Sequence, residues 1–262
     1  MTSLTREIRF FLRNDPLPDR VPNSWVGWND GLVIAPALRL RITVSGPVDR
    51  QTGYVCNIKS LDDALRKTIN QQIATKRDST NRLDELLAGL ANRIEENLPV
   101  GLKWDELELS VTPQFSLKVK RESRQMTFLT KQFEFSAAHR LHCDELSDVE
   151  NIALFGKCNN PSGHGHNYVL EITVSGMTET SSGRLPVHDQ LDLTVKRLVI
   201  DRFDHKHLNV DVPEFADLNP SVENIAATVW KMLNGQLSPL TLHQIRVYET
   251  LKTWADYREE PC

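Results

Sequence analysis

The chain has 262 residues, of which 40% are hydrophobic and 25% are charged, and its formal net charge is −4. These values are typical of a soluble globular protein, and the length suits two domains of about 130 residues each. No apolar run approaches the roughly 18 residues of a membrane span, and the weak negative charge argues against nucleic-acid binding.

The cysteine usage indicates a reducing compartment. The four cysteines are few and irregularly spaced, at positions 56, 143, 158 and 262. This spacing argues against a disulfide framework, and residues 1–7 contain no apolar signal region. We therefore predict a cytoplasmic protein.

Apolar periodicity in the first half predicts the order strand, strand, helix, helix, strand. Residues 38–46 alternate between apolar and polar side chains, as expected for a strand with one buried face. Leu61, Leu65 and Ile69 then follow helical spacing. The predicted elements are strands at 7–12, 38–46 and 106–111, helices at 59–73 and 81–97, and a further strand at 114–120.

The second half repeats this order. Residues 168–176 read YVLEITVSG and residues 38–46 read LRLRITVSG, so the last five positions are identical. We interpret the chain as a tandem duplication, with chance similarity between two α+β domains as the alternative. The charged stretch 118–125 marks the boundary between domains 1–122 and 123–262. The predicted elements of the second half are strands at 128–137, 168–176 and 244–250 and helices at 190–200 and 221–234.

All eight histidines lie in the second half, and three of them form a pattern that indicates a metal site. His164 and His166 would share one face of a strand, because side chains alternate along it. His139 stands at the end of the preceding predicted strand. Three imidazoles without a fourth protein ligand are typical of catalytic zinc, although imidazole also suits other first-row metals. The alternative is that these are polar loop histidines.

Three further residues could supply acid–base chemistry. Cys158 is the only cysteine beside the histidine cluster, and a thiolate near a metal or an imidazole can act as a base or a nucleophile. Its alternative role is a buried structural thiol. Asp204 and His205 are adjacent, so they would serve one site only from a loop or turn. Alone, this pair is weak evidence.

Several segments of the second half resemble the 6-pyruvoyl-tetrahydropterin synthase family. The resemblance spans about residues 128–256 and is carried by segments 135–141 (FSAAHRL), 155–168 (FGKCNNPSGHGHNY), 204–209 (DHKHLN), 220–226 (PSVENIA) and 247–250 (VYET). It implies an α+β tunnelling fold, in which ββααββ units with antiparallel sheets and helices on one face assemble into barrels.

The resemblance also implies the site. It implies that Zn²⁺ is bound by His139, His164 and His166. It further implies that the proton-abstracting group is Cys158, working with Asp204 and His205, and that the substrate-binding residues are Glu249 and Glu223. Val222 stands where the family often has threonine, which removes a hydroxyl near the substrate.

The implied reaction converts 7,8-dihydroneopterin triphosphate to 6-pyruvoyl-tetrahydropterin and releases triphosphate. A related enzyme makes 6-carboxy-tetrahydropterin for 7-deazaguanine biosynthesis and usually has three residues between the cysteine and the first histidine. Five residues separate Cys158 from His164, which favours the pyruvoyl reaction. Two alternatives remain: a 6-carboxy-tetrahydropterin synthase of this kind, and a non-catalytic pterin-binding protein.

The first half carries the fold pattern without the chemistry. It has no histidine, and Cys56 lies outside the catalytic pattern, so we interpret it as structural. We predict that residues 1–122 are a degenerate copy that completes a homo-oligomer, in which three two-unit chains would supply six units. A regulatory pterin-binding role is the alternative.

Overall fold

The computed structural model describes residues 2–12, 35–75, 82–179, 181, 184–185 and 189–258. Cys262 and Asn81, which begins a predicted helix, lie outside these ranges. Among the described residues, no helix is both long enough and apolar enough to cross a membrane.

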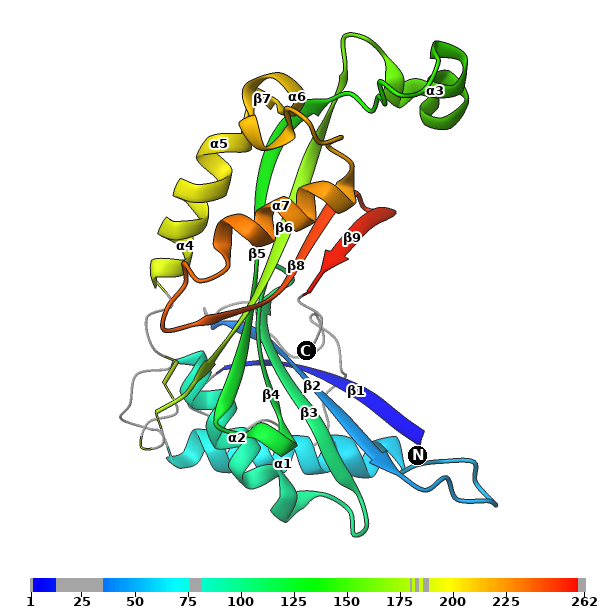
Figure 1. Cartoon of the computed structure of the whole chain (residues 1–262). Helices are drawn as coiled ribbons and strands as arrows, with labels where there is room; N and C mark the ends of the chain where they lie inside the picture. Colours follow the sequence, from blue (N-terminus) through cyan, green and yellow to red (C-terminus); the bar gives the residue numbers. More distant parts are fainter. Residues whose placement is uncertain are drawn as a thin grey trace. The chain divides into compact units, whose positions relative to one another are not determined.

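The chain divides into two compact units, whose elements are labelled in Figure 1. Unit 1 comprises Met1–Leu129 together with the separate segment Gly176–Pro186. Unit 2 comprises Thr130–Ser175 and Val187–Cys262. The division after Leu129 therefore falls a few residues beyond the predicted domain boundary.

Unit 1 is an antiparallel sheet of order β1-β2-β3-β4, with two helices on one face (Figure 1). The type and order of the predicted elements are confirmed, although the first strand begins at Thr2 rather than Glu7. The elements are β1 (Thr2–Phe11), β2 (Ala37–Gly46), α1 (Ile58–Thr75), α2 (Leu83–Asn97), β3 (Lys103–Thr112) and β4 (Phe115–Lys120).

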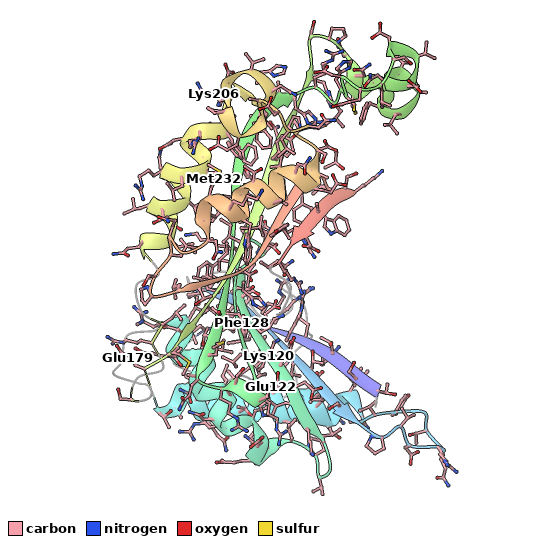
Figure 2. The ribbon with its side chains drawn as sticks, viewed as in Figure 1. Lys120, Glu122, Phe128, Glu179, Lys206 and Met232 are labelled. Carbon is pink, nitrogen blue, oxygen red and sulfur yellow. The ribbon has the colours of Figure 1, made fainter. Side chains whose placement is uncertain are left out.

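The apolar periodicity explains the core of unit 1. Every second residue of β2 is buried, and the predicted apolar face of α1, including Leu61, Leu65 and Ile69, is fully buried. Burial of each such side chain contributes about 1.5–3 kcal/mol. At the end of the sheet, the ammonium of Lys120 lies 5.2 Å from the ring centroid of Phe128 (Figure 2).

Unit 2 has the sheet order β5-β6-β8-β9, and β7 pairs in parallel with β5. Its strands are β5 (Met126–His139), β6 (His164–Met177), β7 (Lys206–His207), β8 (Thr241–Thr250) and β9 (Thr253–Tyr257). Its helices are α3 (Asp148–Phe155), α4 (Asp189–Val195), α5 (Asp201–Phe203), α6 (Leu208–Asp211) and α7 (Val222–Leu233).

Three differences from the predicted elements of unit 2 have local causes. The predicted helix 190–200 consists of α4 and a π-helical turn at Lys196–Ile200, which leads directly into α5. The short strand β9 was not predicted. Nor was α3, because most of its apolar side chains are exposed and leave no buried stripe to recognise. Helix α7 begins where expected, and the Ser221 hydroxyl accepts a hydrogen bond from the Asn224 N–H at 3.3 Å.

The sequence repeat is matched by a repeat in backbone pairing. The register of β2 against β3 shifts between Thr43 and Val44, and the register of β6 against β8 shifts between Thr173 and Val174. These are the same positions of the shared ITVSG segment. The hydroxyls of Thr43 and Thr173 each lie 2.9 Å from a threonine hydroxyl on the preceding strand. The identical residues therefore occupy equivalent structural positions.

Asp84 on α2 connects two segments of unit 1. It accepts hydrogen bonds from the Arg82 guanidinium at 2.7 Å and from the backbone N–H of Leu185 at 2.8 Å. Burial opposes ionisation of this carboxyl, yet the bonds from Arg82 and Leu185 outweigh burial and lower its pKa. Its stabilising contribution is therefore complete above the ordinary carboxyl pKa of 3.8 and is lost as the pH falls through the lowered value.

We expect Asp84→Ala to lower the free energy of unfolding by about 1–3 kcal/mol, because the buried Leu185 N–H loses its acceptor. Urea denaturation at neutral pH would measure this loss. Glu96→Ala, an exposed carboxylate on the same helix, is the matched control. Equal urea midpoints for the two variants would contradict the role given to Asp84.

Candidate active site

The three predicted ligand histidines meet in unit 2. His139 is the last residue of β5, and His164 and His166 are the first and third residues of β6, so the strand interpretation is confirmed. One ligand nitrogen from each ring lies within 4.8 Å of the others. The Nε2 atoms of His139 and His164 are 3.2 Å apart. Two nitrogens at about 2.05 Å from a tetrahedral zinc would lie about 3.3 Å apart, so the spacing fits a shared ion.

A backbone carbonyl orients the most buried of these rings. His139 has no exposed surface, and its Nδ1 lies 2.7 Å from the carbonyl oxygen of Pro220, just before α7. Because a carbonyl only accepts, Nδ1 must carry the proton, which leaves Nε2 free to bind a metal. This contact was missed from the sequence, where Pro220 appeared only as part of a motif.

The environment favours neutral imidazoles, the form that binds metals. Burial lowers the pKa of His139, against the opposing effect of the Pro220 carbonyl. Burial also lowers the pKa of His164, and the neighbouring His166 adds to this effect. Both rings are therefore poised as ligands near neutral pH.

The hydrogen bonding of the cluster is incomplete without a further group. Within the described part of the chain, the buried Nε2 of His166 has no hydrogen-bond partner, although buried polar atoms nearly always have one. Together with the unprotonated Nε2 of His139, this atom fits a metal ion. Imidazole ligands suit several first-row metals, so the donor set indicates a metal without specifying which one.

Glu249 lies beside the histidines, and its substrate-binding role stays a prediction. Its Oε1 atom is 3.4 Å from Nε2 of His139 and 3.6 Å from Nε2 of His166. It belongs to β8, whose pairing with β9 is irregular between Tyr248 and Thr250. The structure thus brings a carboxylate from the far end of the sequence to the edge of the cluster.

Cys158 lies on a 3-10 turn at Gly156–Asn159 and is half-buried. The backbone N–H of Leu141 donates to the Cys158 carbonyl at 2.9 Å. Arg140 donates to the Asn159 carbonyl at 3.3 Å and to its side-chain oxygen at 3.1 Å. The residues that follow His139 therefore hold the turn that carries the thiol.

Asp204 and His205 lie on a turn, as predicted. One Asp204 oxygen accepts from the Ser136 N–H at 2.8 Å, and the other lies 2.8 Å from Nδ1 of His205. The hydrogen bond from the Ser136 N–H lowers the pKa of Asp204 most, and the bond with His205 lowers it further. His205 has a φ of 58°, and its side chain is 83% exposed. The pair is therefore fixed to β5 but open to solvent.

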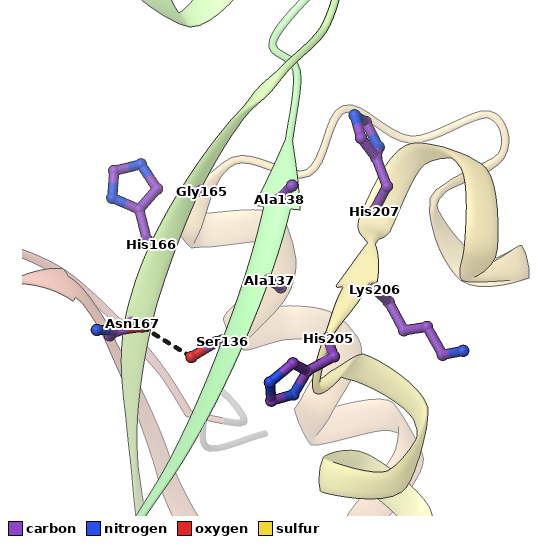
Figure 3. Close-up of a pocket in the computed structure, with 9 residues that line it drawn as sticks. All are labelled: Ser136, Ala137, Ala138, Gly165, His166, Asn167, His205, Lys206 and His207. Atoms are coloured by element: carbon purple, nitrogen blue, oxygen red, sulfur yellow. Dashed lines mark hydrogen bonds between the residues drawn. The ribbon is translucent and has the colours of Figure 1, made fainter.

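A pocket of about 490 Å³ adjoins this turn (Figure 3). His166 extends from β6 on the side away from β5, whereas His205 lies on the other side of β5, next to β7 (Figure 3). Among the described residues, no hydrogen bond joins the thiol of Cys158 to Asp204 or His205. One chain therefore assembles the histidines with Glu249.

Two other residues named from the sequence, Glu223 and His142, do not belong to the histidine cluster. Glu223 is exposed in the first turn of α7, and within the described part of the chain it makes no hydrogen bond or ion pair with the histidine cluster. Its substrate-binding role stays a prediction. His142, interpreted as a polar surface residue, bonds the Asn159 side chain at 2.9 Å and lies outside the cluster.

A second missed residue is Tyr168, on the same face of β6 as His164 and His166. Its ring stacks on Phe135 at 4.9 Å, and its side chain is fully buried. Burial raises the pKa of Tyr168 far above its usual range, and the charges of Glu249 and Cys158 raise it further. A sequence signal for Tyr168 did exist: side chains alternate along the strand from His164 onward, which puts Tyr168 on the face of the two histidines.

Comparison with known proteins agrees with this geometry. Residues 128–260, half of the chain, match the family model described as 6-pyruvoyl tetrahydropterin synthase. The chain is 42% identical over 134 residues to 6-pyruvoyl tetrahydrobiopterin synthase of Drosophila melanogaster, covering 51% of this chain and 80% of that protein. It is 40% identical over 132 residues to the Homo sapiens protein of the same name, covering 50% and 91%.

A more distant relative carries the alternative activity in its name. The 6-carboxy-5,6,7,8-tetrahydropterin synthase of Haemophilus influenzae is 26% identical over 151 residues, covering 50% of this chain and 98% of that protein. Each of these matches covers about half of the chain, and the family model falls on the half that holds the histidine cluster. The chain belongs to the 6-pyruvoyl tetrahydropterin synthase family, and it is a lyase of that type.

Proposed function

We propose that residues 123–262 convert 7,8-dihydroneopterin triphosphate to 6-pyruvoyl-tetrahydropterin and triphosphate. The observation that carries this proposal is the cluster of His139, His164 and His166 with Glu249 at its edge, within the half that matches the family. The pterin would lie with its amino-pyrimidine edge against Glu249 and its side chain toward the histidines.

The proposed cofactor is Zn²⁺, held by Nε2 of His139 and of His164 and by His166. When bound, zinc would act as a Lewis acid on an oxygen of the substrate side chain and make the adjacent C–H more acidic. The Pro220 carbonyl keeps the His139 ring in the tautomer that this requires.

The protein residues have separate tasks in this reaction. Cys158 removes a side-chain proton and returns it elsewhere, so the pterin ring is reduced as the side chain is oxidised, and no external oxidant is needed. Asp204 holds His205 through Nδ1, so His205 can pass protons at its other nitrogen. Glu249 accepts two hydrogen bonds from the pterin and fixes its orientation.

Two observations support the pyruvoyl reaction over the carboxy reaction. Five residues separate Cys158 from His164, which matches the pyruvoyl pattern. The relatives named for the pyruvoyl enzyme are 37–42% identical, against 26% for the carboxy enzyme. The length of this loop decides where the thiol meets the substrate side chain.

We propose that residues 1–122 form a degenerate copy. Aligning Leu38 with Tyr168 places Pro36 at the position of His166. Aligning the pairing of β2 and β3 with that of β6 and β8 places Val111 at the position of Glu249. This copy therefore lacks both a ligand and the carboxylate, and it would serve the assembly. A homo-oligomer, in our proposal a trimer of two-unit chains, would bring Cys158 of one chain to the Asp204–His205 pair of another.

Incubation of the zinc-loaded protein with 7,8-dihydroneopterin triphosphate tests the proposal. We expect stoichiometric triphosphate and 6-pyruvoyl-tetrahydropterin, identified by mass spectrometry under anaerobic conditions. A 6-carboxy-tetrahydropterin product would assign the alternative reaction. A protein that binds the pterin without turnover would contradict the enzymatic proposal.

A further inference from the structure

Helix α3 exposes apolar side chains although polar contacts hold it firmly in place. Its exposed large apolar side chains are those of Val149, Ile152 and Leu154. The helix projects beyond the ends of β5 and β6, apart from the other helices of unit 2 (Figure 1). A helix of eight residues is marginal by itself, and a capping box of Ser147 and Glu150 fixes this one. The described part of unit 2 therefore orders a helix whose apolar surface it leaves uncovered.

Unit 1 carries an apolar groove of about 290 Å³, formed by the end of β2, the start of α1 and the loop between α2 and β3. Its apolar lining includes Pro47, Val55, Val100 and Leu102. The residues that adjoin this lining in sequence add exposed apolar side chains, namely those of Val48, Tyr54 and Ile58.

These two surfaces hold most of the exposed apolar side chains. Twelve large apolar side chains are exposed in the described part of the chain, and seven of them lie on α3 or around the groove. Single exposed apolar residues are ordinary on protein surfaces, whereas clusters mark interaction sites. Both surfaces are therefore expected to be covered by a partner.

The two surfaces also carry opposite charge. Residues 144–155, which contain α3, have four acidic residues and no basic residue. The segments 47–60 and 99–103 around the groove hold three basic residues, Arg50, Lys59 and Lys103, and one acidic residue. That residue, Asp49, is engaged in its own turn, where it accepts a hydrogen bond from the Thr52 N–H at 2.8 Å. The acidic helix and the basic surroundings of the groove are therefore complementary.

The proposed assembly identifies the partner as a second copy of this chain. In that assembly, Cys158 of one chain meets the Asp204–His205 pair of another. Helix α3 ends at Phe155, three residues before Cys158, so its end lies within about 11 Å of the thiol-bearing residue. Helix α3 therefore has to lie at the surface of the chain that receives the thiol.

We propose that α3 of one chain docks into the groove in unit 1 of a second copy. Val149 and Ile152 are three residues apart and share one face of the helix, so both side chains can enter the groove. This inference rests on the proposed function, because the shared site supplies the reason for contact between copies. Unit 1, which lacks the histidines, then serves as the receptor for the helix that precedes the catalytic thiol.

Charge substitutions on the two surfaces test the docking. We expect Ile152→Glu and Val100→Glu each to raise the dissociation constant between chains at least about 10-fold, because each variant buries a carboxylate in an apolar contact. Sedimentation equilibrium of the full chain would measure this constant. Leu193→Glu, an exposed apolar position on α4, is the matched control and should associate as the wild type does.

A double variant tests whether the two positions meet. Ile152→Glu combined with Val100→Lys should associate more tightly than Ile152→Glu alone, since the introduced charges then attract each other. Effects of the two substitutions that simply add would overturn the pairing of α3 with the groove.

The outcomes separate the docking from the proposed function. If the wild type associates and converts the substrate but either glutamate variant associates equally well, the docking is wrong and the reaction stands. If the wild type associates and responds to both variants but has no turnover, the reaction fails and the docking stands. A monomeric wild type with full turnover would overturn the docking and leave the reaction.

Discussion

Replacing His164 with asparagine is expected to lower turnover by at least about 10³-fold, because Lewis-acid stabilisation is worth several kcal/mol and each 1.36 kcal/mol is a factor of ten. The Nε2 atoms of His164 and His139 are 3.2 Å apart, so the substitution removes one of the three imidazoles offered to the metal. Metal content by elemental analysis and turnover at saturating substrate should fall together.

His164 is the suitable ligand to replace because it stands at the start of β6 and is only partly buried. His139 is fully buried and bonded to Pro220, so its loss would disturb folding as well. His243→Asn, an exposed position on β8, is the control and should keep both metal and activity. Full activity in metal-free protein would contradict a catalytic role for the metal.

Cys158→Ala is expected to lower turnover by about 10²–10⁴-fold, the range lost when a general acid–base group is removed. The metal content and melting temperature should be retained, because the turn is held by backbone and Arg140 contacts that do not involve the thiol. Cys143→Ala is the matched control, since that thiol bonds Glu145 at 3.0 Å in a loop. Wild-type turnover in Cys158→Ala would remove the thiol from the mechanism.

The proposal that two chains share each site adds a second test of Cys158. If two chains share each site, inactive Cys158→Ala and His205→Ala proteins, unfolded and refolded together, should regain about a quarter of wild-type turnover. Each restored site needs the thiol from one variant and the imidazole from the other, and random mixing gives one half for each choice. No recovery in confirmed mixed oligomers would mean that one chain supplies both groups.

Much of this architecture could be predicted because the signals are local. The alternation of β2 and the 3.6-residue spacing of α1 depend only on which face of each element is buried. The spacing of His164 and His166 implied a shared strand face for the same reason. Helix α3 was not predicted because it has no buried apolar stripe. It is held instead by the buried Asn151, whose side chain donates hydrogen bonds to three backbone carbonyls.

The sequence by itself determined the ligand types, their strand placement and the motifs that define the family, since these follow from residue identity and short-range spacing. Only the tertiary structure decided that Pro220 orients His139, that Tyr168 lies beside Glu249, and that the Glu249 carboxylate reaches the histidines. The physical reason is that these relations join residues far apart in the chain. Their distances depend on strand register and on packing of the whole unit, which no local pattern encodes.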